Sequence, residues 1–585
     1  MAACFGVFIA VTPVKALDYS LGFSTLLGGS ADEELREVLV LDDGTILVGG
    51  QSHSNDYPVS SSAVQQVYAG EPAGSGNPGV VGGDMVLTRL SASGDSIVAS
   101  TYFGGSKQER SAYAMALDQD GNVVFATVTR SNDLPTTNGA YQRQYGGGAT
   151  DMMVAKISDD LSTLIWSTYV GRSGEDTNRA GFALDADDNV VLAGRTDSTG
   201  LVTPGAYNAQ GGGWDVSVAK LSADGSSLIF ASKFGGSRDE AVPSVRVGTD
   251  GDIQLFGHTW SDDLPTVTPF QGTNPGGVGS PDGFVATLSG DGASLLGSSY
   301  LGGSGAEFGE HFQDFAPDGS RWVVGYTNSS DYPVTGDAFQ SQNNGSGDAF
   351  VTKLSADGNS ILYSTYFGGS GADSFLSPVV DSQGRLLITG GTTSTDLPVT
   401  PNALQSELAG GADGYVAVLS ADGQKVLYAT YLGGSLDDKI RQVEVAPNGD
   451  LLLVGRTASG DFPISQGALQ DSVAGGRDGF IVRLAMTGLE GDYNSDGVVD
   501  AADYTVWRDS LGSPAGSLPN DSDGGAIGAA QYATWVSRYG AVGIPAATSN
   551  TVPEPGSACL SLVLLLLSRT SRAWSYLDRR DPITG

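Results

Sequence analysis

One short phrase recurs seven times along this chain, and it constrains the fold more than any other feature. The copies are FSTLLGGS (23–30), ASTYFGGS (99–106), WSTYVGRS (166–173), FASKFGGS (230–237), GSSYLGGS (297–304), YSTYFGGS (363–370) and YATYLGGS (428–435). Successive copies lie 64 to 67 residues apart, except for one interval of 76 that contains the Gly- and Pro-rich stretch 68–83. Such a period predicts structural units that stack on their neighbours.

Each period reads as four short strands. An aspartate opens an apolar strand in every unit, and the phrase Ser-x-Asp-(Leu/Tyr/Phe)-Pro precedes it in six of the seven. The strand-opening aspartates are Asp84, Asp151, Asp215, Asp282, Asp348, Asp413 and Asp478. Alternating apolar residues, β-branched residues and Gly/Asp turns indicate strands, and no helical period is present. We therefore predict an all-β fold: a seven-bladed β-propeller of about 66-residue, four-stranded blades over residues 17–487.

The two ends of the repeat region complement each other. Residues 19–29 contain only the last strand of a unit, whereas the final unit stops after its third strand at 478–485. The first strand is therefore predicted to complete the last blade, which closes the ring and hides both sheet edges. These phrases resemble the SBBP family of bacterial β-propeller repeats over about residues 18–486. The resemblance implies the fold and no particular activity.

A loop with the spacing of a calcium site follows the repeats. The oxygen ligands expected at positions 1, 3, 5, 7, 9 and 12 are Asp492, Asn494, Asp496, the Val498 carbonyl, Asp500 and Asp503. A hard cation such as Ca²⁺ takes six to eight oxygens, and Gly497 at position 6 permits the sharp turn. The segment 504–512 is echoed 28 residues later by 532–540, and both have one apolar helical face.

This paired arrangement over residues 489–541 resembles a type I dockerin. The resemblance implies a small α-helical calcium module over 488–541 and a cohesin-like partner. The second loop departs from the pattern, because Ser522, Gly524, Gly528 and Gln531 stand where ligands belong. We expect one good calcium site and a second that is weak or absent. A calcium-stabilised module without a partner is the alternative.

The chain ends carry export signals. Residues 1–16 form a short apolar stretch that favours a signal peptide cleaved after Ala16, although the usual positive start is missing. Residues 542–555 form a linker that ends in Pro-Glu-Pro, and 556–585 contain an apolar run followed by arginines. This tail resembles the PEP-CTERM sorting signal, which implies transient membrane anchoring and processing by the exosortase machinery. We expect a secreted protein at the bacterial cell surface or in the extracellular matrix.

Charge and motif content narrow the function classes. The formal net charge is −36, which makes nucleic acid an unfavourable partner. The three histidines are His53, His258 and His311, and we expect the first two to be loop-rim side chains. No nucleophile elbow, HExxH or P-loop motif is present. An acidic residue follows every glycine turn, and we expect it to cap that turn; the alternative is a ring that binds a cation or sugars.

These observations favour a non-enzymatic surface protein whose propeller serves as an interaction, scaffold or adhesion module. The candidate partners are a cohesin-like protein and an extracellular polysaccharide. The alternative is a polysaccharide-degrading enzyme, either a glycoside hydrolase or a lyase, carried on the propeller. A hydrolase needs two carboxylates at an asymmetric site, roughly 5 to 9.5 Å apart. A purely structural envelope component is a third reading.

Overall fold

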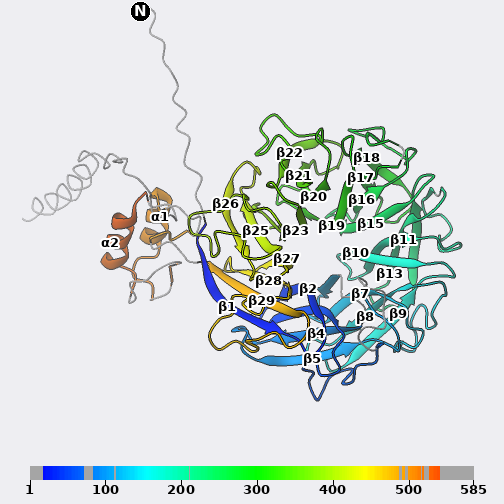
Figure 1. Cartoon of the computed structure of the whole chain (residues 1–585), viewed down its shortest axis with the longest axis horizontal. Helices are drawn as coiled ribbons and strands as arrows, with labels where there is room; N and C mark the ends of the chain where they lie inside the picture. The colour runs from blue at the N-terminus through cyan, green and yellow to red at the C-terminus, as the bar shows by residue number, and fades with distance from the viewer. Residues whose placement is uncertain are drawn as a thin grey trace, which may run out of the picture. The chain divides into compact units, whose positions relative to one another are not determined.

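Seven sheets, each with four antiparallel strands and one with a short fifth strand, surround a central axis in the computed structural model (Figure 1). The structure describes residues 17–71, 83–110, 114–209, 211–277, 279–486, 491–494, 499–514, 517–518 and 526–540. The sheets are the blades of a propeller, so the predicted all-β, seven-bladed architecture is confirmed. The expected signal peptide (1–16), the linker (542–555) and the sorting tail (556–585) lie outside the described residues.

Each blade runs outward from the central channel in sequence order. Blade 1 contains β2 (Glu33–Val40), β3 (Ile46–Ser52), β4 (Asp84–Leu90) and β5 (Ile97–Phe103). Blade 2 contains β6 (Ala114–Leu117), β7 (Val123–Thr129), β8 (Asp151–Ile157) and β9 (Leu164–Val170). Blade 3 contains β10 (Asp176–Leu184), β11 (Val190–Thr196), β13 (Asp215–Leu221) and β14 (Leu228–Phe234), with the short β12 (Asn208–Ala209) beside β14.

The remaining blades repeat this order. Blade 4 contains β15 (Glu240–Val247), β16 (Ile253–Thr259), β17 (Asp282–Leu288) and β18 (Leu295–Leu301). Blade 5 contains β19 (Glu307–Phe315), β20 (Arg321–Thr327), β21 (Asp348–Leu354) and β22 (Ile361–Phe367). Blade 6 contains β23 (Asp373–Val380), β24 (Leu386–Thr392), β25 (Asp413–Leu419) and β26 (Val426–Leu432). Blade 7 contains β27 (Asp438–Val445), β28 (Leu451–Thr457), β29 (Asp478–Met486) and β1 (Tyr19–Leu27).

The core lies between the blades. The seven large clusters of buried apolar side chains each span two neighbouring blades, one cluster at every junction of the ring. The middle strands are therefore covered on both faces, and β7 (VVFATVT) is buried along its whole length. Strands covered on both faces tolerate the nearly continuous apolar runs seen in this sequence. A single blade exposes too much apolar surface to be stable alone, so the ring folds as a unit.

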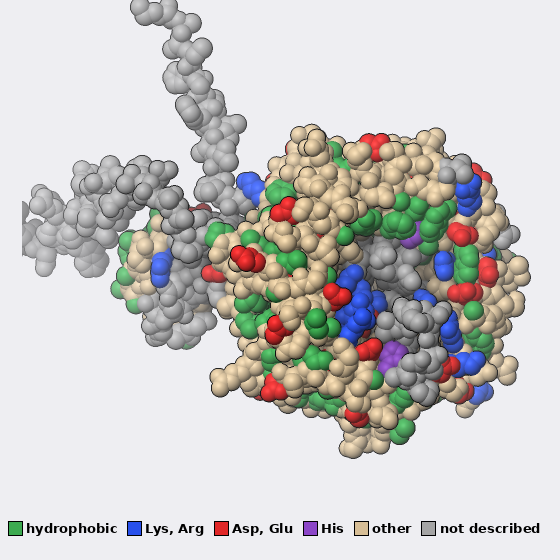
Figure 2. Space-filling model, viewed as in Figure 1, with side chains coloured by type: hydrophobic (Ala, Val, Ile, Leu, Met, Phe, Trp, Pro, Cys, Tyr) green, Lys and Arg blue, Asp and Glu red, His purple; other side chains and the backbone are tan. Residues whose placement is uncertain are grey.

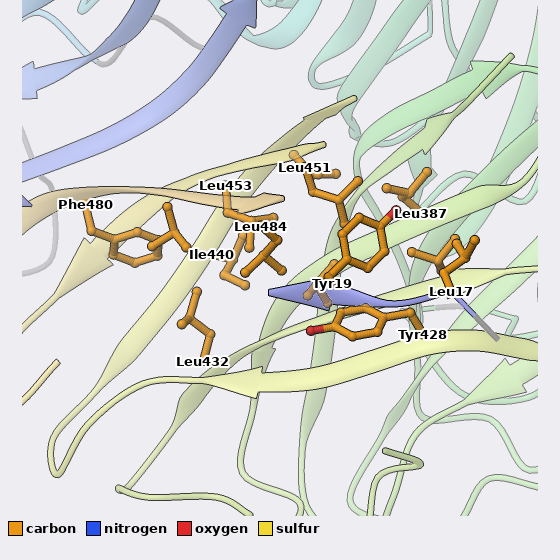
Figure 3. Close-up of a cluster of buried hydrophobic side chains, with 14 of the residues drawn as sticks. Leu17, Tyr19, Leu387, Tyr428, Leu432, Ile440, Leu451, Leu453, Phe480 and Leu484 are labelled. Atoms are coloured by element: carbon orange, nitrogen blue, oxygen red, sulfur yellow. The ribbon is translucent and has the colours of Figure 1, made fainter. Parts of the chain in front are cut away.

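The ring closes through its first strand. β1 pairs antiparallel with β29, from Tyr19 opposite Met486 to Leu27 opposite Gly479. Figure 3 shows Leu17 and Tyr19 among side chains of blades 6 and 7, with Tyr428 beside Tyr19 at a ring-centroid distance of 4.8 Å. The predicted closure is confirmed.

A helical module follows the propeller and contains α1 (Ala501–Asp509) and α2 (Ala529–Arg538). Its two halves exchange equivalent contacts. Trp507 Nε1 donates to the Gly528 carbonyl, and Trp535 Nε1, 28 positions later, donates to the Asp500 carbonyl. Gly512 N donates to the Ile527 carbonyl, and Gly540 N donates to the Val499 carbonyl. The module is thus a duplicated loop–helix unit related by an internal pseudo-twofold. Among the described residues, neither helix is long and apolar enough to span a membrane.

Candidate functional site

The acidic residue after each glycine turn is buried and caps that turn. Glu33 accepts a hydrogen bond from Gly29 N (2.9 Å), and its other oxygen accepts from the hydroxyls of Ser52 (2.7 Å) and Ser54. The same arrangement recurs in every blade. The equivalent residues are Glu109, Asp176, Glu240, Glu307, Asp373 and Asp438. These contacts agree with the expectation that each carboxylate caps its own turn.

Each capping carboxylate also faces the strand-opening aspartate of the preceding blade. A Cβ atom placed on Gly28 would lie 2.7 Å from Glu33 Oε2 and 2.9 Å from Asp478 Oδ1, so only glycine fits between the two carboxyl groups. Burial raises the pKa of Glu33 to about 7 and that of Glu109 to about 8. Burial likewise raises the pKa of Asp84 to about 7. We refer to these seven pairs as the junction carboxyl pairs.

The junction carboxyl pairs are architecture, because one occurs at every blade junction. One buried oxygen in several of them has no hydrogen-bond partner in the structure; these atoms are the Oδ1 atoms of Asp84, Asp151, Asp282, Asp348 and Asp413. A buried carboxyl oxygen in this state is satisfied when a proton is shared with the facing carboxyl group. A functional site is better sought where the blades differ from one another.

The blades differ from one another at the channel mouth, which we define as the residues flanking the Ser or Thr that ends each second strand, together with the described residues at the starts of the innermost strands. The residues before that Ser or Thr are Gln51, Val128, Arg195, His258, Tyr326, Gly391 and Arg456. No two neighbouring blades carry the same residue there. The backbone repeats in all seven blades, but the side chains at this end of the channel differ from blade to blade.

One side of the channel mouth is basic. Glu34, which is 1% exposed, is ion-paired with Arg36 (2.9 Å), Arg456 (3.5 Å) and Arg441. Three guanidiniums thus share one carboxylate, and the Arg456 side chain remains 26% exposed. Burial alone would raise the pKa of Glu34, but the three arginines lower it to about 2. Figure 2 shows Lys and Arg side chains gathered beside the hollow at the centre of the ring.

Lys439 extends this basic arc into blade 6. Its side chain lies against Gly391, with Cγ 3.4 Å from the position that a glycine Cβ would occupy. The absence of a side chain at Gly391 therefore makes room for a cation from blade 7. The basic arc, defined as Lys439, Arg441, Arg456 and Arg36, lies on blades 7 and 1 of a protein with a formal net charge of −36.

The other side of the channel mouth is aromatic. The His258 ring contacts Trp260 and Phe308 at centroid distances of 4.9 and 5.4 Å, and Phe308 contacts Tyr326 at 6.3 Å. These residues, which we call the aromatic wall, belong to blades 4 and 5. Blade 6 separates them from blade 7, which carries Lys439, Arg441 and Arg456. Arg195 of blade 3 stacks on Trp214 at 4.3 Å and continues the wall with a cation.

The lower channel is rich in carboxylates, and its Arg246, Asp314 and Glu444 side chains are half-buried. Arg246 of β15 lies 3.9 Å from Asp314 of β19, and Asp314 accepts a hydrogen bond from Val380 N (2.8 Å). Burial raises the pKa of Asp314, and it raises that of Glu444 on β27 to about 7. Charged side chains of the innermost strands therefore also face one another below the mouth.

The structure describes four of the six predicted calcium ligands. Asp492 and Asp503 are buried, with exposed fractions of 2% and 0%. Asp503 accepts hydrogen bonds from Asn494 N (2.9 Å) and Asp500 N (2.7 Å), and Asp500 caps α1 by accepting from Ala502 N. Asp496 and Val498 lie outside the described residues. Within the described part alone, no three acidic or histidine side chains converge as a metal site.

In the second loop, a neutral side chain makes the capping hydrogen bond that a carboxylate makes in the first. Gln531 occupies the position equivalent to Asp503, and its Oε1 accepts from Gly528 N at 2.8 Å, as Asp503 Oδ2 accepts from Asp500 N. The fold of the second half therefore survives with a neutral side chain at position 12. Residues 519–525 of the second loop lie outside the described residues, so a weak or absent second calcium site stays a prediction.

The expectation that His258 is a loop-rim side chain is wrong, because His258 lies within β16. His258 is 4% exposed and forms the centre of the aromatic wall, and the basic arc was not predicted at all. His53 lies at the equivalent rim of blade 1, and the side chain of His311 lies outside the described residues. Superposing the seven repeats position by position, and asking where they disagree, would have found the mouth residues.

The fold defines the chain as a seven-bladed β-propeller. No protein-family model and no curated protein matches the chain. A protein of unknown function from Dyadobacter fermentans DSM 18053 is 11% identical, with 80% of this chain and 99% of that chain covered and a TM-score of 0.38.

Two enzymes give similar values. The polysaccharide lyase Uly1 is 10% identical, with 80% and 99% of the two chains covered and a TM-score of 0.38. A europium-containing methanol dehydrogenase is 13% identical, with 81% and 96% covered and a TM-score of 0.37. Likeness at this level spans unrelated activities, so function is argued from the site itself.

Proposed function

We propose that this chain is a secreted, non-enzymatic binding protein whose propeller presents the channel mouth to an extracellular polymer. One observation carries the proposal: a sevenfold frame built from repeated turn caps supports a rim on which the side chains differ from blade to blade. Symmetric parts serve the fold, and the asymmetric rim is free to specialise for a ligand. The acidic exterior suits solubility outside the cell.

The alternative, a glycoside hydrolase, gains no support from the carboxylates. Most acidic residues that recur by repeat are buried turn caps, and they pair identically at each junction. A hydrolase requires one exposed pair that differs from the others. The lyase form of the alternative needs a base near an acidic sugar, and His258 and Tyr326 are the rim residues that could take that role.

Incubating the full chain with soluble and insoluble polysaccharides separates the two readings. We expect retention of the protein on one polymer class without release of new reducing ends or unsaturated products. A heat-denatured sample gives the background. Sustained product formation above that background would move the protein into the enzyme class and contradict the binding proposal.

We also propose that the helical module is a dockerin-like calcium module with one occupied loop. Support comes from the oxygen-only ligand set, from the burial of Asp492 and Asp503, and from the loop closure made by Asp503. Asp492, Asn494, Asp496, the Val498 carbonyl, Asp500 and Asp503 would hold the ion. A bound Ca²⁺ would neutralise carboxylates that otherwise repel one another. A cohesin-like protein is the partner that this module would take.

Removing one ligand should abolish calcium binding by this loop. We expect Asp492→Ala in the full chain to lose the heat of Ca²⁺ binding and the calcium-dependent rise in the melting temperature of the module. Asp509→Ala is the matched control, because Asp509 is exposed and pairs only locally with Arg508. An unchanged binding heat in Asp492→Ala would show that the ligand assignment is wrong.

For localisation, we propose export followed by exosortase processing of the C-terminal tail. The support is the sequence alone: the apolar stretch 1–16, the Pro-Glu-Pro motif and the apolar and Arg-rich segment 556–585. Mass spectrometry of the mature protein would locate both processing sites. Intact termini in the extracellular protein would contradict this proposal.

A further inference from the structure

Blade 3 differs from the other blades at one buried position of its outermost strand. Lys233 of β14 is 5% exposed and stands where the repeated phrase has tyrosine or leucine in the other six copies. The equivalent residues are Leu26, Tyr102, Tyr169, Tyr300, Tyr366 and Tyr431. In blade 1, Tyr102 donates a hydrogen bond to the Ser54 carbonyl from this place. In blade 3 the same place brings a primary amine into the interior of the propeller.

The amine of Lys233 lies beside the strand-opening aspartate of its own blade. Its Nζ atom is 3.4 Å from Asp215 Oδ2, and the two side chains are 6% and 4% exposed. The backbone fixes this approach, because β13 and β14 are adjacent antiparallel strands with Ser217 opposite Lys233. In blade 1, by contrast, the neutral amide of Gln65 donates to the equivalent Asp84 Oδ2 at 2.8 Å.

A second carboxyl group faces Asp215 from the next blade. A Cβ atom placed on Gly235 would collide with both Asp215 Oδ1 and Glu240 Oε2, so the two carboxyl groups converge over this glycine. Burial raises the pKa of Glu240 to about 7 and also raises that of Asp215. Glu240 can therefore hold a proton near neutral pH. Lys233 thus approaches one oxygen of Asp215, and Glu240 approaches the other.

These three side chains are held together where little water reaches them. Glu240 is 0% exposed, as are Val216 and Phe234, which follow Asp215 and Lys233 in the chain. A buried ion pair is costly, because both charges have left water. An amide made from the same two groups carries no charge, so its formation removes that cost. Groups fixed at contact distance also react far faster than the same groups free in solution.

From this geometry we infer that the side chains of Lys233 and Asp215 join in an intramolecular isopeptide bond, with Glu240 as the proton donor and acceptor. The bond would link β13 to the outermost strand β14, so the edge of blade 3 could not peel away from the sheet. This inference is independent of the proposed binding function.

The reaction needs no oxidant and no co-reactant. Nζ of Lys233 first gives one proton to Asp215, which leaves a neutral amine and a neutral acid. The lone pair of Nζ then forms a bond to Cγ of Asp215. Glu240 gives its proton to Oδ1, the Cγ–Oδ1 bond breaks, and this oxygen leaves as water with two protons. Glu240 recovers one proton from Nζ, so the products are one amide and one water molecule.

Tryptic digestion of the purified full chain tests the inference, because trypsin does not cleave after a lysine whose amine is acylated. We expect a branched product in which peptide 196–220, which contains Asp215, is joined to peptide 221–238, which contains Lys233. Its mass should be lower than the sum of the two peptides by one water, about 18 Da. Fragmentation by mass spectrometry locates the bond. Separate linear peptides 196–220 and 221–233, with no branched product, overturn the inference.

The ion pair of Lys220 with Asp185 is an internal control in the same blade. Its Nζ to Oδ2 distance is shorter, 2.8 Å, but the two side chains are 14% and 9% exposed. The Asp185 carboxylate also accepts a hydrogen bond from the neutral Asn189 amide at 3.0 Å. We expect normal cleavage after Lys220. An isopeptide bond at Lys220 as well would show that proximity alone is sufficient, which would contradict the role given to Glu240.

Two variants test the roles of the groups. Lys233→Arg should remove the branched product completely, because it has no amine at this place. Glu240→Gln can still cap its turn but cannot transfer a proton, so we expect at least tenfold less branched product. Glu307→Gln is the matched control, because Glu307 caps the equivalent turn of the next blade by accepting from Gly303 N. It should yield as much branched product as the parent chain.

Circular dichroism shows whether each variant is folded. An unchanged yield in folded Glu240→Gln overturns the role of Glu240, and an equal loss in Glu307→Gln shows that the loss reflects the turn cap instead. The digest of the parent chain decides the existence of the bond even where a variant does not fold.

Discussion

A chain that begins at residue 28 should not fold to a stable propeller. It lacks β1, so β29 becomes an open edge and the Tyr19, Phe23, Leu26 and Leu27 side chains are missing from the junctions on both sides of blade 7. Burying each of these side chains contributes about 1.5–3 kcal/mol, and the strand hydrogen bonds are lost as well. Their sum is comparable to the whole stability of a typical domain, about 5–15 kcal/mol. Thermal denaturation followed by circular dichroism measures the effect.

A peptide rescue and a pair of point variants test whether the loss of stability comes from failure of the ring to close. Adding a peptide of residues 17–30 should restore the melting transition, because an extended peptide can pair with the exposed edge of β29. Among point variants, Leu26→Ala should cost about 2–5 kcal/mol, whereas Ser20→Ala, at an exposed position of the same strand, should cost almost nothing. An unchanged melting temperature in the chain that begins at residue 28 would show that closure does not stabilise the ring.

The second large effect is a loss of stability as the pH rises from about 4 to 8. Each junction carboxyl pair has at least one member with a raised pKa in the fold, about 7 for Asp84 and Asp151 and about 8 for Glu109 and Asp282, chiefly because that group is buried. In the unfolded chain such groups have pKa values near 4. The folded protein therefore holds protons that the unfolded chain has released. Stability is fully present below the unfolded pKa and declines until the pH passes the folded pKa.

The size of this effect follows from the number of protons held. Two pairs that each keep one proton would already lower the free energy of unfolding by about 2.7 kcal/mol per pH unit. We expect the melting temperature of the propeller to fall steadily between pH 5 and 8.5 in buffers of constant ionic strength with a chelator present. Asp84→Asn should reduce the slope of stability against pH by the contribution of about one proton, because the amide cannot ionise. A melting temperature that is constant or rises over this range would contradict the prediction.

The ring could be predicted from the sequence because its information is repeated. Seven copies of the glycine phrase and of the strand-opening aspartate gave the blade count, and the split last unit gave the closure. The pairing of Asp84 with Glu109 could not be predicted in the same way. These residues belong to different blades, and only the stacking of blade 1 on blade 2 brings them to either side of Gly104.

The channel mouth was not predicted, because its residues are not repeated from blade to blade. Arg456, Tyr326 and Gly391 occupy the same place in three blades, but they share no chemistry, so each looks like ordinary variation in a repeat. Their meaning appears only when the ring places them around one channel. The calcium loop could be predicted from the sequence because all of its ligands lie within one short segment. Its ligand geometry stays a prediction, because Asp496 and Val498 lie outside the described residues.

The pairing of β1 with β29 also has a consequence for the order of events during synthesis. The first strand of the propeller to leave the ribosome needs the last one as its partner, and contacts such as Ser24 N to Ser465 Oγ join residues 441 positions apart. The remaining blades must therefore be made while β1 waits unpaired, and contacts of such long range form slowly. The ring can close only after nearly the whole chain has emerged, so a chain exported in an unfolded state would complete its fold on the far side of the membrane.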